Sequence, residues 1–224
     1  MSRLFFLPTE ISYGIFGVMV YSFFKFQPLA VVAVFTFSIF ILLVFRRSSV
    51  PYRDTQKMNG EMYLSPVHGV VQSIRHSVSC PEYPSPCHEV RISMSLWEEK
   101  GLYLPTSGEV LLLKASKGKK VNRSSPTLQF SSFSEELSHT DFTLTSKNET
   151  LTLLRFIDCT AGVRPTIWLK SGDRGRGGAC FGYYPFGGTL LIYVPATSDV
   201  LVFEKEEVVP GQTVIASLID QPKV

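Results

Sequence analysis

The chain has 224 residues, with 22 Lys and Arg against 19 Asp and Glu, for a formal net charge of +3. This length allows one ordinary domain plus an appendage. So small a net charge argues neither for nor against nucleic acid. Because the sequence has no long basic arm and no nucleic-acid motif, we expect no nucleic-acid partner. The four cysteines are too few for a disulfide framework, so we expect free thiols in a reducing compartment.

The N-terminal region, residues 1–47, is the most apolar part of the chain and predicts a hydrophobic helical hairpin. The run Leu29–Phe45 is uncharged over about 17 residues, near the lower limit for a helix that spans a bilayer. A shorter apolar run, Ile11–Phe24, precedes it. Pro28 favours a turn between the two, because a residue before proline avoids helical backbone angles. We therefore expect a membrane-anchoring domain here.

Basic residues set the expected orientation of this anchor. Arg46 and Arg47 follow the second run directly. By the positive-inside rule, they hold the C-terminal side on the cytoplasmic face of the cell membrane. Because both runs are short, two arrangements stay open: a hairpin that spans the bilayer and one that lies in its interface.

Residues 48–224 predict a second domain that is mainly β. Short apolar or β-branched runs alternate with turns rich in proline and glycine, without an amphipathic helix of reliable length. This pattern is typical of a barrel-sandwich-like β domain. The predicted strands are Gly69–Ile74, Glu89–Met94, Gly108–Leu113, Thr150–Phe156, Thr166–Leu169, Thr189–Val194, Asp199–Phe203 and Gln212–Ser217. We expect the polar stretch Lys114–Phe142 to be a long, partly mobile loop.

Two clusters of side chains outside the glycine-rich region give only weak indications of a functional site. The first could be imagined as a zinc site, but its cysteines lack the close C-x-x-C spacing, so we expect a solvent-facing loop and no metal. It consists of His76, Cys80, Cys87 and His88. The second is a basic run, which fits either a solvated loop or a surface that binds anionic lipid headgroups. It consists of Lys114, Lys117, Lys119, Lys120 and Arg123.

A glycine-rich stretch, Lys170–Pro195, contains seven glycines and runs into an apolar strand. Glycines at this density permit tight turns or a close approach of another backbone. Gly172-Asp173, Gly178, Phe181-Gly182, Phe186-Gly187 and Tyr193-Val194-Pro195 together resemble a motif of the short bacterial form of phosphatidylserine decarboxylase. Further motifs of that family follow in order from about Phe45 to Leu218. They are Phe45-Arg46, Ser65-Pro66-Val67-His68-Gly69, Arg91-Ile92-Ser93, Pro105-Thr106-Ser107-Gly108, Asn148-Glu149 and Gly211-Gln212-Thr213.

The resemblance implies a pyruvoyl enzyme, whose ketone forms a Schiff base with the substrate amine so that the carboxylate leaves as carbon dioxide. In that family the ketone arises from a serine whose hydroxyl attacks the preceding carbonyl. This chain has Gly188 at the serine position, which cannot attack. It also has His68 in place of the family's acidic residue and Lys100 in place of its histidine. We therefore expect no self-processing and no cofactor, with a pyruvoyl group only if processing occurs.

One hydroxyl remains next to the cleavage position, on Thr189. Neighbouring side chains of a strand face opposite sides, so we expect Thr189 to point away from the site. Processing at Thr189, giving an active decarboxylase that makes phosphatidylethanolamine, stays open as an alternative.

The sequence thus predicts a membrane-anchored relative of phosphatidylserine decarboxylase with a binding or regulatory role in phospholipid metabolism. We expect a headgroup pocket at His68, Gly187, Gly188 and Thr189. Its expected partners are membrane phospholipid, with phosphatidylserine as a candidate, and a second copy or an active paralogue. A structural membrane protein that uses the β domain for protein contacts stays open as a further alternative.

Overall fold

The computed structural model describes residues 61–79, 86–95, 98–118, 137–146, 148–158 and 164–218. It also describes a few helical positions near the N-terminus, residues 13–14, 17, 20–21, 32 and 34–39. Most of the predicted hairpin, and its boundary at residue 47, lie outside the described residues. No helix within this described part is long and apolar enough to cross a membrane.

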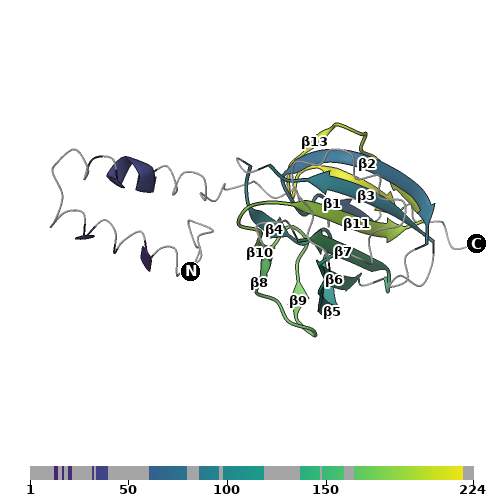
Figure 1. The fold of residues 1–224 in the computed structure, drawn as a ribbon. Helices are drawn as coiled ribbons and strands as arrows, with labels where there is room; N and C mark the ends of the chain where they lie inside the picture. The colour runs from purple at the N-terminus through teal and green to yellow at the C-terminus, as the bar shows by residue number, and fades with distance from the viewer. Residues whose placement is uncertain are drawn as a thin grey trace, which may run out of the picture.

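The described part of the chain from residue 61 onward is built of strands (Figure 1). Their bounds are β1 Glu61–Leu64, β2 Gly69–Val78, β3 Cys87–Ser93, β4 Gly101–Tyr103, β5 Gly108–Ser116, β6 His139–Ser146, β7 Leu151–Ile157, β8 Thr166–Ile167, β9 Arg174–Gly175, β10 Cys180–Tyr183, β11 Thr189–Pro195, β12 Ser198–Val200, β13 Glu207–Val208 and β14 Val214–Leu218. The prediction of a mainly β domain is confirmed.

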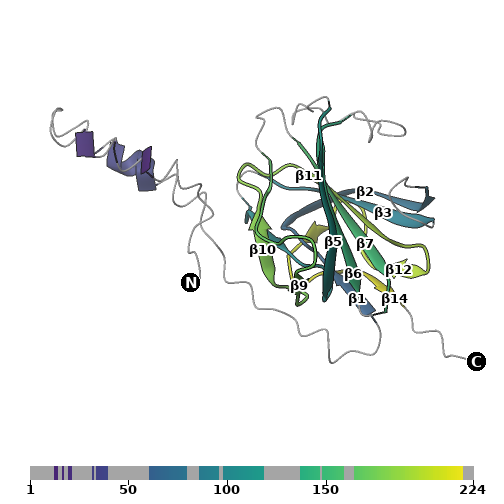
Figure 2. The ribbon, with the colours of Figure 1, turned by 90° about the horizontal axis from the view of Figure 1, so that it is seen from below.

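The strands form one large sheet and two small ones, all open. The eight-stranded sheet has the order β13-β2-β3-β11-β7-β6-β5-β9, and the small sheets have the orders β1-β14-β12 and β4-β10-β8. All the paired strands are antiparallel. Seen from below, the large sheet curves from β2 and β3 round to β5, and β10 stands beside this curve (Figure 2).

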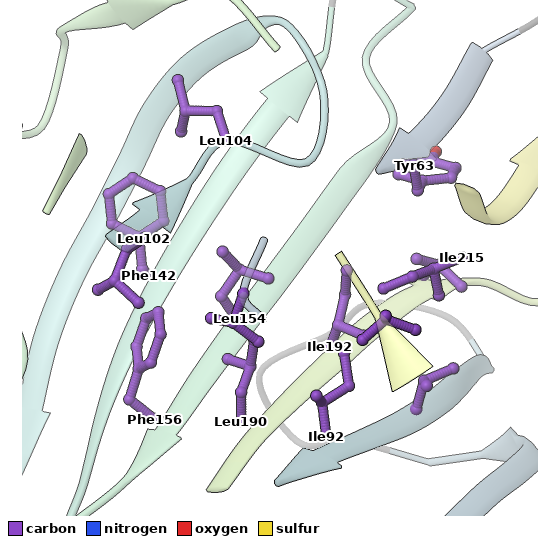
Figure 3. Close-up of a cluster of buried hydrophobic side chains, with 14 of the residues drawn as sticks. Tyr63, Ile92, Leu102, Leu104, Phe142, Leu154, Phe156, Leu190, Ile192 and Ile215 are labelled. Atoms are coloured by element: carbon purple, nitrogen blue, oxygen red, sulfur yellow. The ribbon is translucent and has the colours of Figure 1, made fainter. Parts of the chain in front are cut away.

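The main core lies between the large sheet and both small sheets. The large sheet contributes alternate residues of its central strands, among them Ile92, Phe142, Leu154, Phe156, Leu190 and Ile192 (Figure 3). Leu102 and Phe181 come from the β4-β10-β8 sheet, and Tyr63 and Ile215 come from the β1-β14-β12 sheet. Phe142 and Phe181 stack with ring centroids 4.6 Å apart. This apolar contact across the layers joins the sheets into one domain.

The opposite face of the central strands is buried too. A second apolar cluster there includes Leu153 of β7 and both Leu191 and Tyr193 of β11. On β11, the residues of the main core alternate with those of the second cluster, as the two-residue period of a strand requires.

Each of the eight predicted strands overlaps an observed one, but two predictions of loop and strand extent are wrong. The predicted loop Lys114–Phe142 begins inside β5 and ends inside β6, which starts at His139. The predicted strand Asp199–Phe203 is paired only as far as Val200. Six strands were not predicted: β1, β4, β6, β9, β10 and β13.

The prediction of a solvent-facing loop at the possible zinc cluster is also wrong where the structure describes it. His76 lies in β2, whereas Cys87 and His88 lie in β3 and are buried. Both ring nitrogens of His88 are engaged, Nδ1 with Ser77 N at 3.3 Å and Nε2 with the Ala196 carbonyl at 3.1 Å. Cys80 lies outside the described residues.

Candidate functional site

A tight turn between β10 and β11 carries Gly188, the residue that the motif resemblance predicts to stand at the family's serine position. The Gly187 N–H donates to the Tyr184 carbonyl at 3.0 Å, which closes a β-turn with Pro185 at its second position. Gly187 has φ +66°, a left-handed conformation that glycine adopts without a steric penalty. The Gly188 carbonyl then accepts from Met94 N at 2.8 Å, so residue 188 already lies in register with β3.

The ring of Tyr184 lies directly against Gly188. A Cβ atom placed on Gly188 would lie 2.7 Å from Tyr184 Cε1 and 2.8 Å from both Cζ and Oη. Real Cβ atoms essentially never approach so closely, so any side chain at 188 would have to displace this ring. The fully buried Tyr184 therefore occupies the space in which a side chain at position 188 would start.

Three contacts hold Tyr184 in this position. Its hydroxyl donates to the Ile157 carbonyl at 2.8 Å, and Ile157 is the cross-strand partner of Thr189. Its backbone N–H donates to the Lys100 carbonyl at 2.8 Å. Its ring meets Phe156 edge-on, with centroids 6.3 Å apart. Because a buried tyrosine hydroxyl needs a hydrogen-bond partner, the Ile157 carbonyl fixes the direction of the ring.

The end of β7 that receives this hydroxyl adjoins a buried ion pair. Arg155 binds Asp141 through two hydrogen bonds, Nε–Oδ1 at 2.7 Å and Nη2–Oδ2 at 2.9 Å, with both side chains 2% exposed. His139 Nε2 lies 3.4 Å from Asp141 Oδ2. The hydrogen bond to Asp141 raises the pKa of His139, against the opposing effect of its burial. These charges tie β6 to β7 on the face opposite the main core.

Lys100 contacts this turn. Its side chain is completely buried, and its Nζ donates to the Ser95 carbonyl. The same carbonyl would lie 3.2 Å from a Cβ on Gly187. Lys100 thus contacts the site both through its backbone, at Tyr184, and through its ammonium, beside Gly187.

His68 lies at the same end of the sheet but two strands away. It precedes Gly69, the first residue of β2, and Val70 and Thr189 both pair with Ser93 of the intervening strand β3. Its Nε2 is 3.1 Å from Glu207 Oε1, with the histidine side chain 25% exposed. The structure therefore gathers Gly187, Gly188 and Lys100 around one turn and places His68 beside Glu207.

Thr189 is half-buried and is the first residue of β11. Its neighbour Leu190 points into the main core, whereas Leu191 belongs to the second cluster. Alternation along the strand places the Thr189 side chain on the Leu191 face, whereas position 188 faces the core and Tyr184.

Of the basic run, Lys114 and Lys117 are exposed at the C-terminal end of β5. The other members, Lys119, Lys120 and Arg123, lie outside the described residues.

The sequence of the chain is similar to those of several known proteins. A protein of Anaplasma phagocytophilum (strain HZ), named phosphatidylserine decarboxylase proenzyme, is 31% identical over 195 residues, or 82% of each chain. The chain belongs to the phosphatidylserine decarboxylase family. A protein of the same name from Parabacteroides distasonis is 22% identical over 184 residues, covering 82% of this chain and 81% of that protein. Another, from Wolbachia pipientis wMel, is 30% identical over 169 residues, covering 71% and 69%. No family model matches the chain.

Sequence reasoning missed Tyr184. The signal available was an aromatic residue followed by proline, four positions before Gly188. That signal predicts a turn but not the direction of the ring, which depends on a carbonyl of β7, a strand distant in the sequence.

Proposed function

We propose that this protein is a membrane-associated member of the phosphatidylserine decarboxylase family that does not process itself. It binds phospholipid and acts as a binding or regulatory subunit in phospholipid metabolism. Residues 1–47 anchor it to the cell membrane, and residues 48–224 form the phospholipid-binding domain on the cytoplasmic face. The relatives' names point to phosphatidylserine as the phospholipid.

The relationship between Gly188 and Tyr184 carries this proposal. A pyruvoyl group needs a hydroxyl-bearing residue at its own position, and Gly188 has no side chain. A Cβ at 188 would meet the Tyr184 ring at 2.7 Å, so the surroundings do not fit such a residue either. The residues present therefore do not fit a pyruvoyl group at 188. Thr189 offers no substitute, because it lies on the other face of β11.

A charged pair at the same end of the sheet as the turn supports headgroup binding. Phosphatidylserine presents a phosphate, a carboxylate and an ammonium. His68 is partly exposed at the sheet end shared with Thr189, and Glu207 beside it is 67% exposed. A histidine–carboxylate pair can offer a donor to the phosphate and an acceptor to the ammonium. We therefore place the headgroup at His68, Thr189 and the turn Gly187-Gly188.

Titration of the full chain in detergent with dihexanoyl phosphatidylserine, followed calorimetrically, tests the binding. We expect stronger binding than to dihexanoyl phosphatidylcholine. H68A should weaken it at least about tenfold, since a hydrogen bond to a charged group contributes about 1.5–3 kcal/mol. K205Q, a change at an exposed turn residue, should leave it unchanged. Equal affinity for the two lipids would contradict the proposed ligand, and carbon dioxide release from phosphatidylserine would contradict the non-processing state.

A further inference from the structure

Two charged side chains at the end of β7 form a pair that the proposed headgroup site does not include. Asp158 follows β7 directly, and its side chain is 1% exposed. Its Oδ2 accepts from Ser138 Oγ at 2.6 Å and from Arg164 Nε at 3.0 Å. The side chain of Arg164 is 42% exposed. The pair therefore joins a buried carboxylate to a guanidinium that solvent can reach.

The Asp158–Arg164 pair lies beside the turn that carries Gly188. In the large sheet, β7 lies between β6 and β11 (Figure 1). Thr189 of β11 is the cross-strand partner of Ile157, the residue before Asp158. His68 lies on the other side of Thr189, beyond β3. The pair and the proposed headgroup site thus flank Thr189 on opposite sides and are separate.

One oxygen of the buried carboxylate is unsatisfied. Within the described ranges, Asp158 Oδ1 has no hydrogen-bond partner. A buried carboxylate oxygen without a donor is unfavourable, because it has lost its hydration and gained no bond in return. In native folds such an atom is normally met by a bound water, ion or ligand. The partner that Oδ1 lacks is a donor.

The guanidinium of Arg164 has donors to spare. Its Nε donates to Asp158, and its Nη2 lies 3.4 Å from Ser138 Oγ. A guanidinium carries five N–H donors in one plane, and Arg164 makes no further hydrogen bond to the part of the chain that the structure describes. Because two of its nitrogens are already held, the direction of the guanidinium is set before a ligand arrives. Its remaining donors suit the oxygens of an anion.

The other described charges at this end of the sheet leave the pair available. The buried ion pair that ties β6 to β7 is self-contained, and His139 lies with it, 3.4 Å from Asp141. Lys117 is exposed one residue after Ser116, and the Ser116 carbonyl accepts from Ser138 Oγ at 3.3 Å. The described cation closest along the chain to this contact therefore favours an anionic group beside the guanidinium.

We propose that Asp158 and Arg164 bind an α-amino acid group, with the ammonium at Asp158 Oδ1 and the carboxylate at the guanidinium. Both charges of such a group are carried on one carbon, which matches a carboxylate and a guanidinium that are already in contact. The ammonium supplies the donor that Oδ1 lacks, and the carboxylate can accept two parallel N–H bonds. Because Oδ1 is buried, the long side chain of Arg164 shifts as the ligand enters, a rotamer change common in binding. A free amino acid and the serine headgroup of a lipid both carry this group.

The ligand side of the test uses calorimetric titration of the full chain in detergent with L-serine and two analogues. Ethanolamine lacks the carboxylate of serine, and 3-hydroxypropanoate lacks its ammonium. We expect L-serine to bind at least about tenfold more tightly than either, since each analogue loses one charge-assisted contact. Dihexanoyl phosphatidylserine against dihexanoyl phosphatidylethanolamine repeats the comparison for a lipid. A preference for serine in the free series alone, or in the lipid series alone, identifies the source.

The protein side of the test compares R164Q with R174Q. Both arginines are exposed and each bonds one carboxylate, but Glu109, the partner of Arg174, is 36% exposed and not buried. R164Q should weaken the binding of the serine-bearing ligand at least about tenfold, whereas R174Q should leave it unchanged. D158N should weaken it as well, and R164Q keeps the test decisive if D158N does not fold. H68A should leave the affinity for L-serine unchanged, because His68 lies on the other side of Thr189.

Equal affinities for serine and its analogues, or equal effects of R164Q and R174Q, would overturn the proposal. Folded protein that binds neither L-serine nor phosphatidylserine would also overturn it and would leave a water molecule as the donor to Asp158 Oδ1. Binding that is lost in H68A but kept in R164Q would place the amino acid group at the headgroup site. That result would reject the Asp158–Arg164 pair and leave the proposed function standing.

Discussion

The ring of Tyr184 lies where a side chain at position 188 would begin, with Cε1 2.7 Å from the Cβ position of residue 188. Two features thus coincide at position 188. Gly188 lacks the nucleophile, and Tyr184 fills the space that a nucleophile's side chain would need. The hydroxyl of Tyr184 is bonded to Ile157, so its ring is not free to swing away without losing a buried hydrogen bond.

G188A should therefore destabilise the fold. The added methyl overpacks a fixed ring, which typically lowers the free energy of unfolding by about 1–3 kcal/mol. The measurement is urea unfolding of wild type, G188A, Y184L and the double variant. Because Y184L vacates the ring's space, G188A should be nearly neutral in that background. Strictly additive effects would show that the two residues do not compete for space.

K100M should lower the free energy of unfolding by about 1.5–3 kcal/mol, since it removes the charged donor of the buried Lys100 from the Ser95 carbonyl. Urea unfolding measures this loss. K205M, at an exposed turn, is the control and should stay within about 0.5 kcal/mol of wild type. A neutral K100M would mean that the ammonium contributes nothing to holding the turn.

R155M should destabilise the protein by about 3–5 kcal/mol, because it leaves the Asp141 carboxylate buried without its main partner. The double change R155M/D141L should recover much of this loss. R174M breaks the ion pair with Glu109, in which Arg174 is 84% exposed, and should change stability by less than about 1 kcal/mol. Similar losses for R155M and R174M, measured by chemical unfolding, would contradict the assigned burial.

Stability should fall with rising pH through the pKa of His139. Hydrogen bonding to Asp141 raises this pKa in the folded protein, so folding favours the protonated ring. The contribution of protonated His139 to the free energy of unfolding is complete below the ordinary histidine pKa of about 6.5. It disappears as pH rises through the pKa that His139 has in the folded protein. Urea midpoints across this window should decline for wild type and for H76Q, and the decline should be smaller for H139Q. An unchanged slope in H139Q would assign the effect to another group.

Periodicity was enough to predict the strands whose faces differ clearly. β11 is found because Leu190 and Ile192 alternate with residues of the opposite face inside a sharply bounded apolar run. β6 is missed because His139 and Asp141, which are buried, read as polar loop residues. Their burial depends on Arg155 of another strand, a partner that local sequence cannot reveal. Strands as short as β9 and β13, with two residues each, carry no period at all.

The site divides in the same way. The order of family motifs singles out Gly188, His68 and Lys100 as candidate positions, an assignment that stays a prediction. That order does not show that Lys100 reaches the Ser95 carbonyl, or that His68 pairs with Glu207. The position of Tyr184 needs the tertiary structure, since the partner that orients it lies 27 residues earlier in the chain.

The most direct test of the account is the intact mass of the purified full chain, measured beside that of G188S. We predict one uncut chain for the wild type, because residue 188 offers no hydroxyl. We also predict an uncut G188S, because the Tyr184 ring holds the serine's space and because the motif resemblance predicts that His68 and Lys100 stand where the family has its other processing residues. Two wild-type fragments that meet at Gly187, the second with a mass showing a pyruvoyl end, would contradict the central claim. Cleavage of G188S alone would show that the missing hydroxyl suffices and that Tyr184 plays no blocking part.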